Sequence, residues 1–197
     1  MNAGEDKMTY ETSKMGCNEP LSVDGINLAQ THYDVKNAAK SDLAWSGIGQ
    51  YTDTVNPMHM LILMGAIANK GVPVMPYMVE RVTSVFNVPI KEGYGKAGER
   101  MINENTADKL EEIMRYTVKN NYGDSSFPGL TVCAKTGTGE TAKNEDPNAW
   151  MVGFSQDEDC PLAFVVVVEH GGFGSKAAGP IAKTMMKMGS DLIRKNK

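Results

Sequence analysis

The four residues Lys135-Thr136-Gly137-Thr138 bring together groups that could hold a small anion beside a reacting carbonyl. The lysine supplies a cation and the threonines supply hydroxyl groups, while the glycine has no side chain, so a ligand can approach its backbone closely. Side chains alternate along a strand, so Thr136 and Thr138 lie on one side and can converge on one ligand group. Their hydrogen bonds to a charged group are stronger than neutral ones. The motif therefore predicts a site that binds a carboxylate.

Three strands are predicted around this motif, at residues 130–138, 149–154 and 162–169. The segments between them are short and rich in turn residues, which favours antiparallel hairpin connections. The run Phe164–Val168 is apolar on both faces, which predicts a central strand in a sheet that is covered on both sides.

Three helices are predicted to cover this sheet. Asn56-Pro57 combines a capping side chain with proline at the first helical position, and the apolar run after it predicts a buried helix with Gly71 as its C′ residue. A second helix is predicted to begin at Asn105-Thr106 and end at Gly123, and an amphipathic third helix spans residues 175–195. The expected fold is α/β of the α+β type, with an antiparallel sheet covered by helices.

The remaining segments carry weaker patterns. Residues 1–44 are polar and are interpreted as loops and short helical turns, and residues 44–51 as a loop of small residues. Residues 73–86 alternate in a way that predicts extended chain. Residues 87–98 hold four glycines or prolines and are predicted to form a loop.

Composition narrows the function classes. With 197 residues, 41% hydrophobic and 22% charged, the chain fits one globular domain or a large part of one. A net charge of −4 without a long basic run gives no reason to propose nucleic acid as a partner. Cys17, Cys133 and Cys160 form no CxxC pair and the histidines lack metal-binding spacing, so we expect inert buried cysteines and no metal site. No apolar stretch of about 18 residues predicts a membrane span, and the first residues lack the pattern of a secretory signal.

Several segments around the motif resemble a known family. Upstream are AWSGIGQ, an apolar helix ending in IANKG, and VMPYMVERV; AKTGTGE, NAWMVGF, PLAFVVVVE and the Gly-Pro start of the last helix follow in order. A Lys-Thr-Gly tripeptide alone arises often by chance. Matched segments in the right order are far more specific, and over most of residues 41–190 they resemble the transpeptidase domain of class B penicillin-binding proteins.

This resemblance implies a serine D,D-transpeptidase that acts through an acyl-enzyme, binds peptidoglycan stem peptides and β-lactams, and uses no metal or organic cofactor. It implies that Lys135 attracts the terminal carboxylate of the substrate and that Thr136 and Thr138 hydrogen-bond the same group. It further implies that Gly137 permits close approach and that the backbone N–H of Thr138 stabilises the oxyanion.

Two motifs of this family do not occur in the chain. The family carries its nucleophile in an S-x-x-K motif and has a second S-x-N motif, and neither is found in these 197 residues. Thr106–Lys109 imitates the first on the polar face of another helix, and Ser13–Asn18 has the wrong spacing for the second. We therefore expect residues 1–197 to be the C-terminal part of a transpeptidase domain, inactive by itself, with residues 1–44 as a connecting segment and 45–197 as the matched region.

Two residues near the motif have less specific patterns. Trp150 is interpreted as an aromatic that packs under the sheet rather than as a ligand platform. Gln50 follows two glycines in a loop and could either line a cleft or shape that loop.

The resemblance also implies a setting and leaves alternatives. The parent protein is expected at the extracytoplasmic face of the bacterial cytoplasmic membrane, with its anchor outside this chain. Part of a sheet would expose an apolar face and an open edge, so we expect association with a second copy or with the missing N-terminal part of the domain. A β-lactam sensor or β-lactamase stays possible and would differ by β-lactam hydrolysis. A non-catalytic binding module also stays possible and would lack S-x-x-K in the upstream coding sequence.

Overall fold

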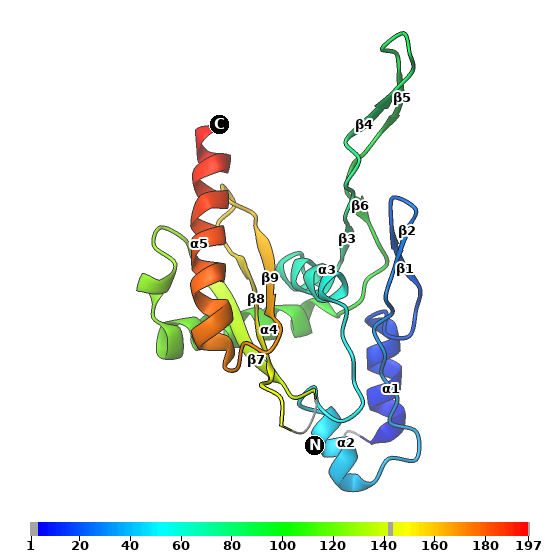
Figure 1. Cartoon of the computed structure of the whole chain (residues 1–197), viewed down its shortest axis with the longest axis vertical. Helices are drawn as coiled ribbons and strands as arrows, with labels where there is room; N and C mark the ends of the chain where they lie inside the picture. The colour runs from blue at the N-terminus through cyan, green and yellow to red at the C-terminus, as the bar shows by residue number, and fades with distance from the viewer. Residues whose placement is uncertain (1–3, 142–143, 197) are drawn as a thin grey trace.

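The computed structural model describes residues 4–141 and 144–196, and a three-stranded antiparallel sheet lies at its centre (Figure 1). Its strands, in spatial order, are β7 (Val132–Gly139), β8 (Asn148–Ser155) and β9 (Ala163–Val168). Each strand pairs antiparallel with the next one along the chain. The three predicted strands and their hairpin connections are therefore confirmed, with small shifts at the ends.

Helices cover both faces of the sheet. They are α3 (Pro57–Ala68), α4 (Glu104–Thr117) and α5 (Gly174–Lys195). Because side chains alternate along β7, Val132 and Ala134 join the hydrophobic cluster beneath α5, whereas Cys133 joins the cluster beneath α3 and α4. The predicted fold class, an antiparallel sheet covered by helices, is confirmed.

Strand β9 lies at an edge of the sheet that the described residues form, so the prediction that it is central is wrong for this sheet. Among the described residues, no strand pairs with its outer edge. Helix α3 contacts β9 on one face and α5 contacts it on the other. The apolar run at Phe164–Val168 therefore reflects two covered faces, and these do not require a strand on each side.

Helix α3 begins as predicted, because the side chain of Asn56 accepts a hydrogen bond from the N–H of Met58 at 2.8 Å. Its C′ residue is Lys70 rather than Gly71, since the C-cap is Asn69. Gly71 follows with φ +90°, and a Cβ atom there would lie 1.8 Å from the carbonyl oxygen of Ile102. Gly71 therefore serves a close backbone approach to the segment before α4.

The second and third predicted helices are present. Helix α4 begins at Glu104 after the N-cap residue Asn103, slightly earlier than expected. A π-helix (Val118–Tyr122) continues it up to Gly123, which has φ +79° and ends the helical segment as predicted. A short 3-10 turn follows at Asp124–Ser126.

Residues 1–44 contain more regular structure than predicted. Their elements are α1 (Glu5–Lys14), the hairpin of β1 (Leu21–Val23) and β2 (Ile26–Leu28), and the start of α2 (Lys40–Ser46). Helix α1 buries none of its residues and therefore needs no apolar face. Its sequence lacks the apolar periodicity from which a helix is predicted, so this helix was missed. Helix α2 also occupies the first part of residues 44–51, so the loop of small residues begins only at Gly47.

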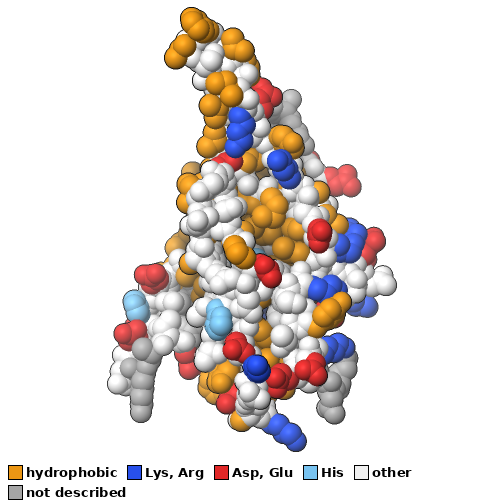
Figure 2. Space-filling view, turned by 90° about the vertical axis from the view of Figure 1, so that its right-hand side faces the viewer, with side chains coloured by type: hydrophobic (Ala, Val, Ile, Leu, Met, Phe, Trp, Pro, Cys, Tyr) orange, Lys and Arg blue, Asp and Glu red, His pale blue; other side chains and the backbone are white. Residues whose placement is uncertain are grey.

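An extended arm replaces the loop that was predicted at residues 87–98. Its strands are β3 (Val74–Met75), β4 (Arg81–Thr83), β5 (Pro89–Glu92) and β6 (Lys96–Ala97), which pair antiparallel as β3 with β6 and β4 with β5. Pro89 begins a strand in a two-stranded ribbon, where a missing N–H is tolerated. The arm extends away from the sheet (Figure 1), and apolar side chains gather at its tip (Figure 2), where Val85 and Phe86 are 95% and 86% exposed.

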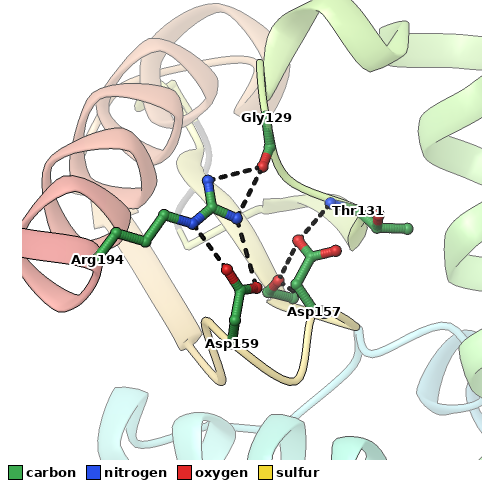
Figure 3. Close-up of polar contacts among 6 residues, drawn as sticks. Gly129, Thr131, Asp157, Asp159 and Arg194 are labelled. Carbon is green, nitrogen blue, oxygen red and sulfur yellow. Dashed lines mark hydrogen bonds and ion pairs between the residues drawn. The ribbon is translucent and has the colours of Figure 1, made fainter. Parts of the chain in front are cut away.

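Arg194, near the end of α5, fixes this helix over the sheet. Its guanidinium donates to the carboxylate of Asp159 at 3.0 Å and to the carbonyl of Gly129 at 3.2 Å (Figure 3). In the same cluster, the carboxylate of Asp157 accepts a hydrogen bond from the N–H of Thr131 at 2.7 Å. The β8–β9 turn, the segment before β7 and the last helix are thereby joined.

Candidate functional site

A cleft of about 560 Å³ lies between strand β7 and the loop that follows α2. One wall consists of residues 135–141, and the opposite wall consists of residues 48–55. All four residues of the Lys-Thr-Gly-Thr motif line this cleft, so the structure brings the sequence-predicted site together in one place.

The outer edge of β7 carries the backbone groups that a ligand can reach. The N–H of Thr136 donates to the Tyr122 hydroxyl at 2.9 Å, and the carbonyl of Thr138 accepts from Nε2 of Gln50 at 2.9 Å. These two residues therefore direct their backbone groups away from β8. Because N–H and C=O of one residue share a side in an antiparallel strand, the N–H of Thr138 also lies on this outer edge.

Lys135 places its charge at the same edge. Its side chain is exposed, and Nζ donates to the carbonyl of Thr136 at 2.7 Å. Alternation puts the Lys135 side chain on the opposite face of the strand from the two threonines. The ammonium and the hydroxyls therefore approach the edge from the two faces of the sheet.

Thr136 lies between the cleft and a second cavity of about 450 Å³ beside the start of α5. Its hydroxyl is 2.9 Å from the hydroxyl of Tyr122. Sequence reasoning missed Tyr122, because the only local signal was its position directly before Gly123. The π-helix after α4 brings Tyr122 to the strand, and such helices are frequent at functional sites.

Gly137 makes room for a neighbouring side chain as well as for a ligand. A Cβ atom at Gly137 would lie 3.2 Å from Cβ of Trp150, its partner on β8. Trp150 is half-buried and lines the cleft. It therefore packs against the sheet, as predicted, and also forms part of the site wall.

Gln50 fulfils both roles that the sequence left open, since it lines the cleft and ties its loop to β7. The base of the loop is held by a hydrogen bond from the Ser46 hydroxyl to the Asp53 carboxylate at 2.9 Å. Burial raises the pKa of Asp53, although the Ser46 hydrogen bond acts in the opposite direction. A backbone bridge between His32 and Thr54 closes the same loop.

The buried cysteines offer little reactive chemistry. Cys133 and Cys160 are buried as predicted, whereas Cys17 is only partly buried. Burial raises the pKa of the Cys133 thiol to about 12, so the thiol stays protonated at neutral pH. Within residues 4–141 and 144–196, no group of three or more His, Cys, Asp or Glu side chains is arranged to hold a metal ion.

A family model described as the penicillin binding protein transpeptidase domain matches residues 2–187. The chain belongs to the penicillin-binding protein transpeptidase family. The match covers far more than the Lys-Thr-Gly-Thr motif, so membership does not depend on four residues.

Curated members of the transpeptidase family are longer than this chain. Peptidoglycan D,D-transpeptidase PbpA of Mycolicibacterium smegmatis is 26% identical over 183 residues, which are 91% of this chain and 37% of that protein. The protein of the same name from Mycobacterium tuberculosis is 27% identical over 153 residues, or 74% of this chain and 31% of that protein. The chain thus spans about a third of the length of these relatives.

Solved structures of penicillin-binding proteins share the fold. The crystal structure of PBPA from Mycobacterium tuberculosis matches with a TM-score of 0.83 at 24% identity. The match covers 95% of this chain and 46% of the PBPA chain. A penicillin G acyl-enzyme complex of the same protein matches with a TM-score of 0.80 at 23% identity. That match covers 96% of this chain and 43% of the chain in the complex. At this identity, the similarity establishes the fold.

Proposed function

We propose that this chain is part of a serine D,D-transpeptidase that cross-links peptidoglycan stem peptides by acyl transfer and is acylated by β-lactams. The observation that carries the proposal is the edge of β7, where the motif lines the cleft and the N–H of Thr138 faces outward. Membership of the transpeptidase family supports it, as do relatives that bear the name D,D-transpeptidase.

The motif residues bind and orient the substrate. The ammonium of Lys135 attracts the terminal carboxylate, and the hydroxyls of Thr136 and Thr138 donate to it. The carboxylate anchors the substrate with its scissile carbonyl beside the N–H of Thr138. This N–H then donates to the carbonyl oxygen as negative charge develops there.

The nucleophilic serine comes from polypeptide outside this sequence, which contains no S-x-x-K. Its oxygen bonds to the carbonyl carbon and passes its proton to a base, while the carbonyl oxygen becomes an oxyanion. When the intermediate collapses, the carbon–nitrogen bond breaks and the leaving amine takes up a proton. A second amine then attacks the acyl-enzyme, which forms the cross-link and releases the serine.

The setting follows from the substrate. Stem peptides lie outside the cytoplasmic membrane, so the parent protein acts at its extracytoplasmic face. Among the helices of the described residues, none has both the length and the apolar character needed to cross a bilayer. The penicillin G acyl-enzyme complex of the Mycobacterium tuberculosis protein supports the β-lactam part of the proposal.

Covalent labelling with a fluorescent penicillin tests the proposal. We expect no band that survives denaturation with this chain alone, and a labelled band with a longer polypeptide that joins the chain to an upstream segment carrying S-x-x-K. In that polypeptide, Lys135→Ala should slow labelling by roughly tenfold or more, because a charge aimed at the anion is lost.

Lys109→Ala is the matched control, since Lys109 lies exposed on α4 away from the cleft. Labelling of this chain alone would contradict the proposal. Rapid turnover of the label by the longer polypeptide would instead identify a β-lactamase.

A further inference from the structure

The Tyr122 hydroxyl makes two hydrogen-bond contacts with the motif, and neither has a role in the proposed transpeptidase reaction. Its hydroxyl accepts the backbone N–H of Thr136 at 2.9 Å and is also 2.9 Å from the hydroxyl of Thr136. One phenol therefore holds both the backbone and the side chain of a residue that lines the cleft.

The position of this phenol is fixed by its surroundings. Within the π-helix, the N–H of Gly123 donates to the carbonyl of Val118 at 2.8 Å, and the Ser126 hydroxyl donates to the carbonyl of Tyr122 at 2.8 Å. The Tyr122 side chain packs against the hydrophobic cluster beneath α5. The backbone and the ring are thus held, and the hydroxyl group points at β7.

The direction of the two hydrogen bonds decides what Thr136 can offer a ligand. A phenol has one proton to donate and lone pairs to accept. Since the Tyr122 oxygen accepts the N–H of Thr136, its own proton is available to donate to Oγ1 of Thr136. In that arrangement the hydroxyl proton of Thr136 remains free to donate into the cleft.

We propose that Tyr122 is a positioning residue that holds the Thr136 hydroxyl as a hydrogen-bond donor toward a ligand carboxylate. Tyr122 itself does not touch the ligand, because it approaches Thr136 from the second cavity. The inference rests on the proposed function in one respect only, namely that the cleft binds a carboxylate.

The first test uses this chain alone, with N-acetyl-D-alanine as a carboxylate probe and N-acetyl-D-alaninamide as its neutral counterpart. Tyr122→Phe removes only the hydroxyl. We expect it to weaken binding of the carboxylate probe by roughly tenfold, followed by NMR of the Thr136 and Thr138 amides, and to leave the neutral probe unaffected. The amide proton of Thr136 should also shift in the free variant, because its acceptor is gone.

Two further variants separate positioning from general stability. Thr136→Val should weaken binding of the carboxylate probe to a similar degree. The double variant should lose little further affinity, since both changes remove the same contact between the Tyr122 and Thr136 hydroxyls. Tyr116→Phe is the matched control, because Tyr116 is 66% exposed on α4 and should change neither probe.

The outcomes distinguish this inference from the proposed function. The inference is overturned if Tyr122→Phe weakens the binding of both probes equally, or of neither. It is also overturned if the amide proton signal of Thr136 does not shift in the free variant. If the chain binds the carboxylate probe in this Tyr122-dependent way but the longer polypeptide with S-x-x-K is not labelled by penicillin, the inference stands and the proposed function fails. If the wild-type chain shows no preference for the carboxylate probe, the inference is overturned, whereas the proposed function is still decided by penicillin labelling of the longer polypeptide.

Discussion

At the scale of single residues, side chains occupy most of the polar groups on the outer edge of the motif. Tyr122 takes the N–H of Thr136, Lys135 donates to the carbonyl of Thr136, and Gln50 donates to the carbonyl of Thr138. The fourth group, the N–H of Thr138, faces the cleft without needing any rearrangement. This pattern both blocks the edge against added strands and presents one donor for an oxyanion.

Gln50→Ala removes the only one of these three contacts that spans the cleft. We expect the free energy of unfolding to fall by about 1 kcal/mol, because a typical internal hydrogen bond contributes that much. Urea denaturation at neutral pH measures the change. Gln50→Glu should be at least as destabilising at that pH, since an ionised carboxylate cannot donate to the Thr138 carbonyl. Equal stability of all three proteins would show that the contact is not maintained in solution.

At the scale of elements, helix α5 depends on the polar cluster at its C-terminal end as well as on its apolar face. The cluster joins Arg194 to Asp159 and Gly129, while Asp157 caps the N–H of Thr131 (Figure 3). The apolar face of α5 packs on the sheet, and Arg194 ties its C-terminal end to the segment before β7 and to the β8–β9 turn.

This cluster predicts an acid-sensitive contribution to stability. Burial raises the pKa of Asp157, but hydrogen bonds from Thr131 and Ser155 and the charge of Arg194 outweigh burial, so the pKa lies below its ordinary value. The folded state therefore favours the carboxylate. Its contribution is complete above the unfolded pKa, about 3.9, and is lost as pH falls through the lower folded pKa.

Asp157→Asn should be less stable than wild type at neutral pH and should lose less stability on acidification. Thermal unfolding between about pH 2 and pH 6 checks this, since the difference between the two proteins should shrink below about pH 4. Glu158→Gln, on the same turn, is the matched control. A constant difference across this range would contradict the assignment.

At the scale of the whole molecule, two neighbouring surfaces lack cover. Among the described residues, the outer edge of β9 pairs with no strand. Helix α5 also exposes an apolar stripe at helical spacing, formed by Ile181, Met185, Met188 and Leu192. Exposed apolar surface of this kind marks an interaction site, and the relatives are about two and a half times as long as the chain. We propose that a second copy, or the missing part of the domain, covers the stripe.

Size-exclusion chromatography with light scattering tests this proposal. The chain alone should self-associate in a concentration-dependent way, and Met185→Lys combined with Leu192→Glu should shift it toward the monomer because charges do not pack on an apolar surface. Lys183→Glu, an exposed position on the opposite side of the same helix from the stripe, should leave the association unchanged. A well-folded wild-type monomer at high concentration would count against the proposal.

Local signals account for most of the agreement between the predicted and the observed fold. Asn56-Pro57 begins α3, Gly123 ends the helical segment after α4, and the strands are correct because capping, turn residues and side-chain alternation act over a few residues. Two elements were not predicted from the sequence. Helix α1 has no apolar face, and in the arm of β3 to β6 the glycines and Pro89 indicated a loop.

Sequence patterns alone predicted the family and four of the residues that line the cleft. The folded structure adds that β9 lies at an edge of the sheet formed by the described residues, that Trp150 joins the site wall, and that Tyr122 and Gln50 contact Thr136 and Thr138. Each of these facts depends on which elements pair or pack together in space, as when Tyr122 of the π-helix and Gln50 of the loop after α2 both contact β7. Such contacts leave no periodicity or spacing in the sequence, so only the packing of α4, the π-helix and the loop after α2 around β7 reveals them.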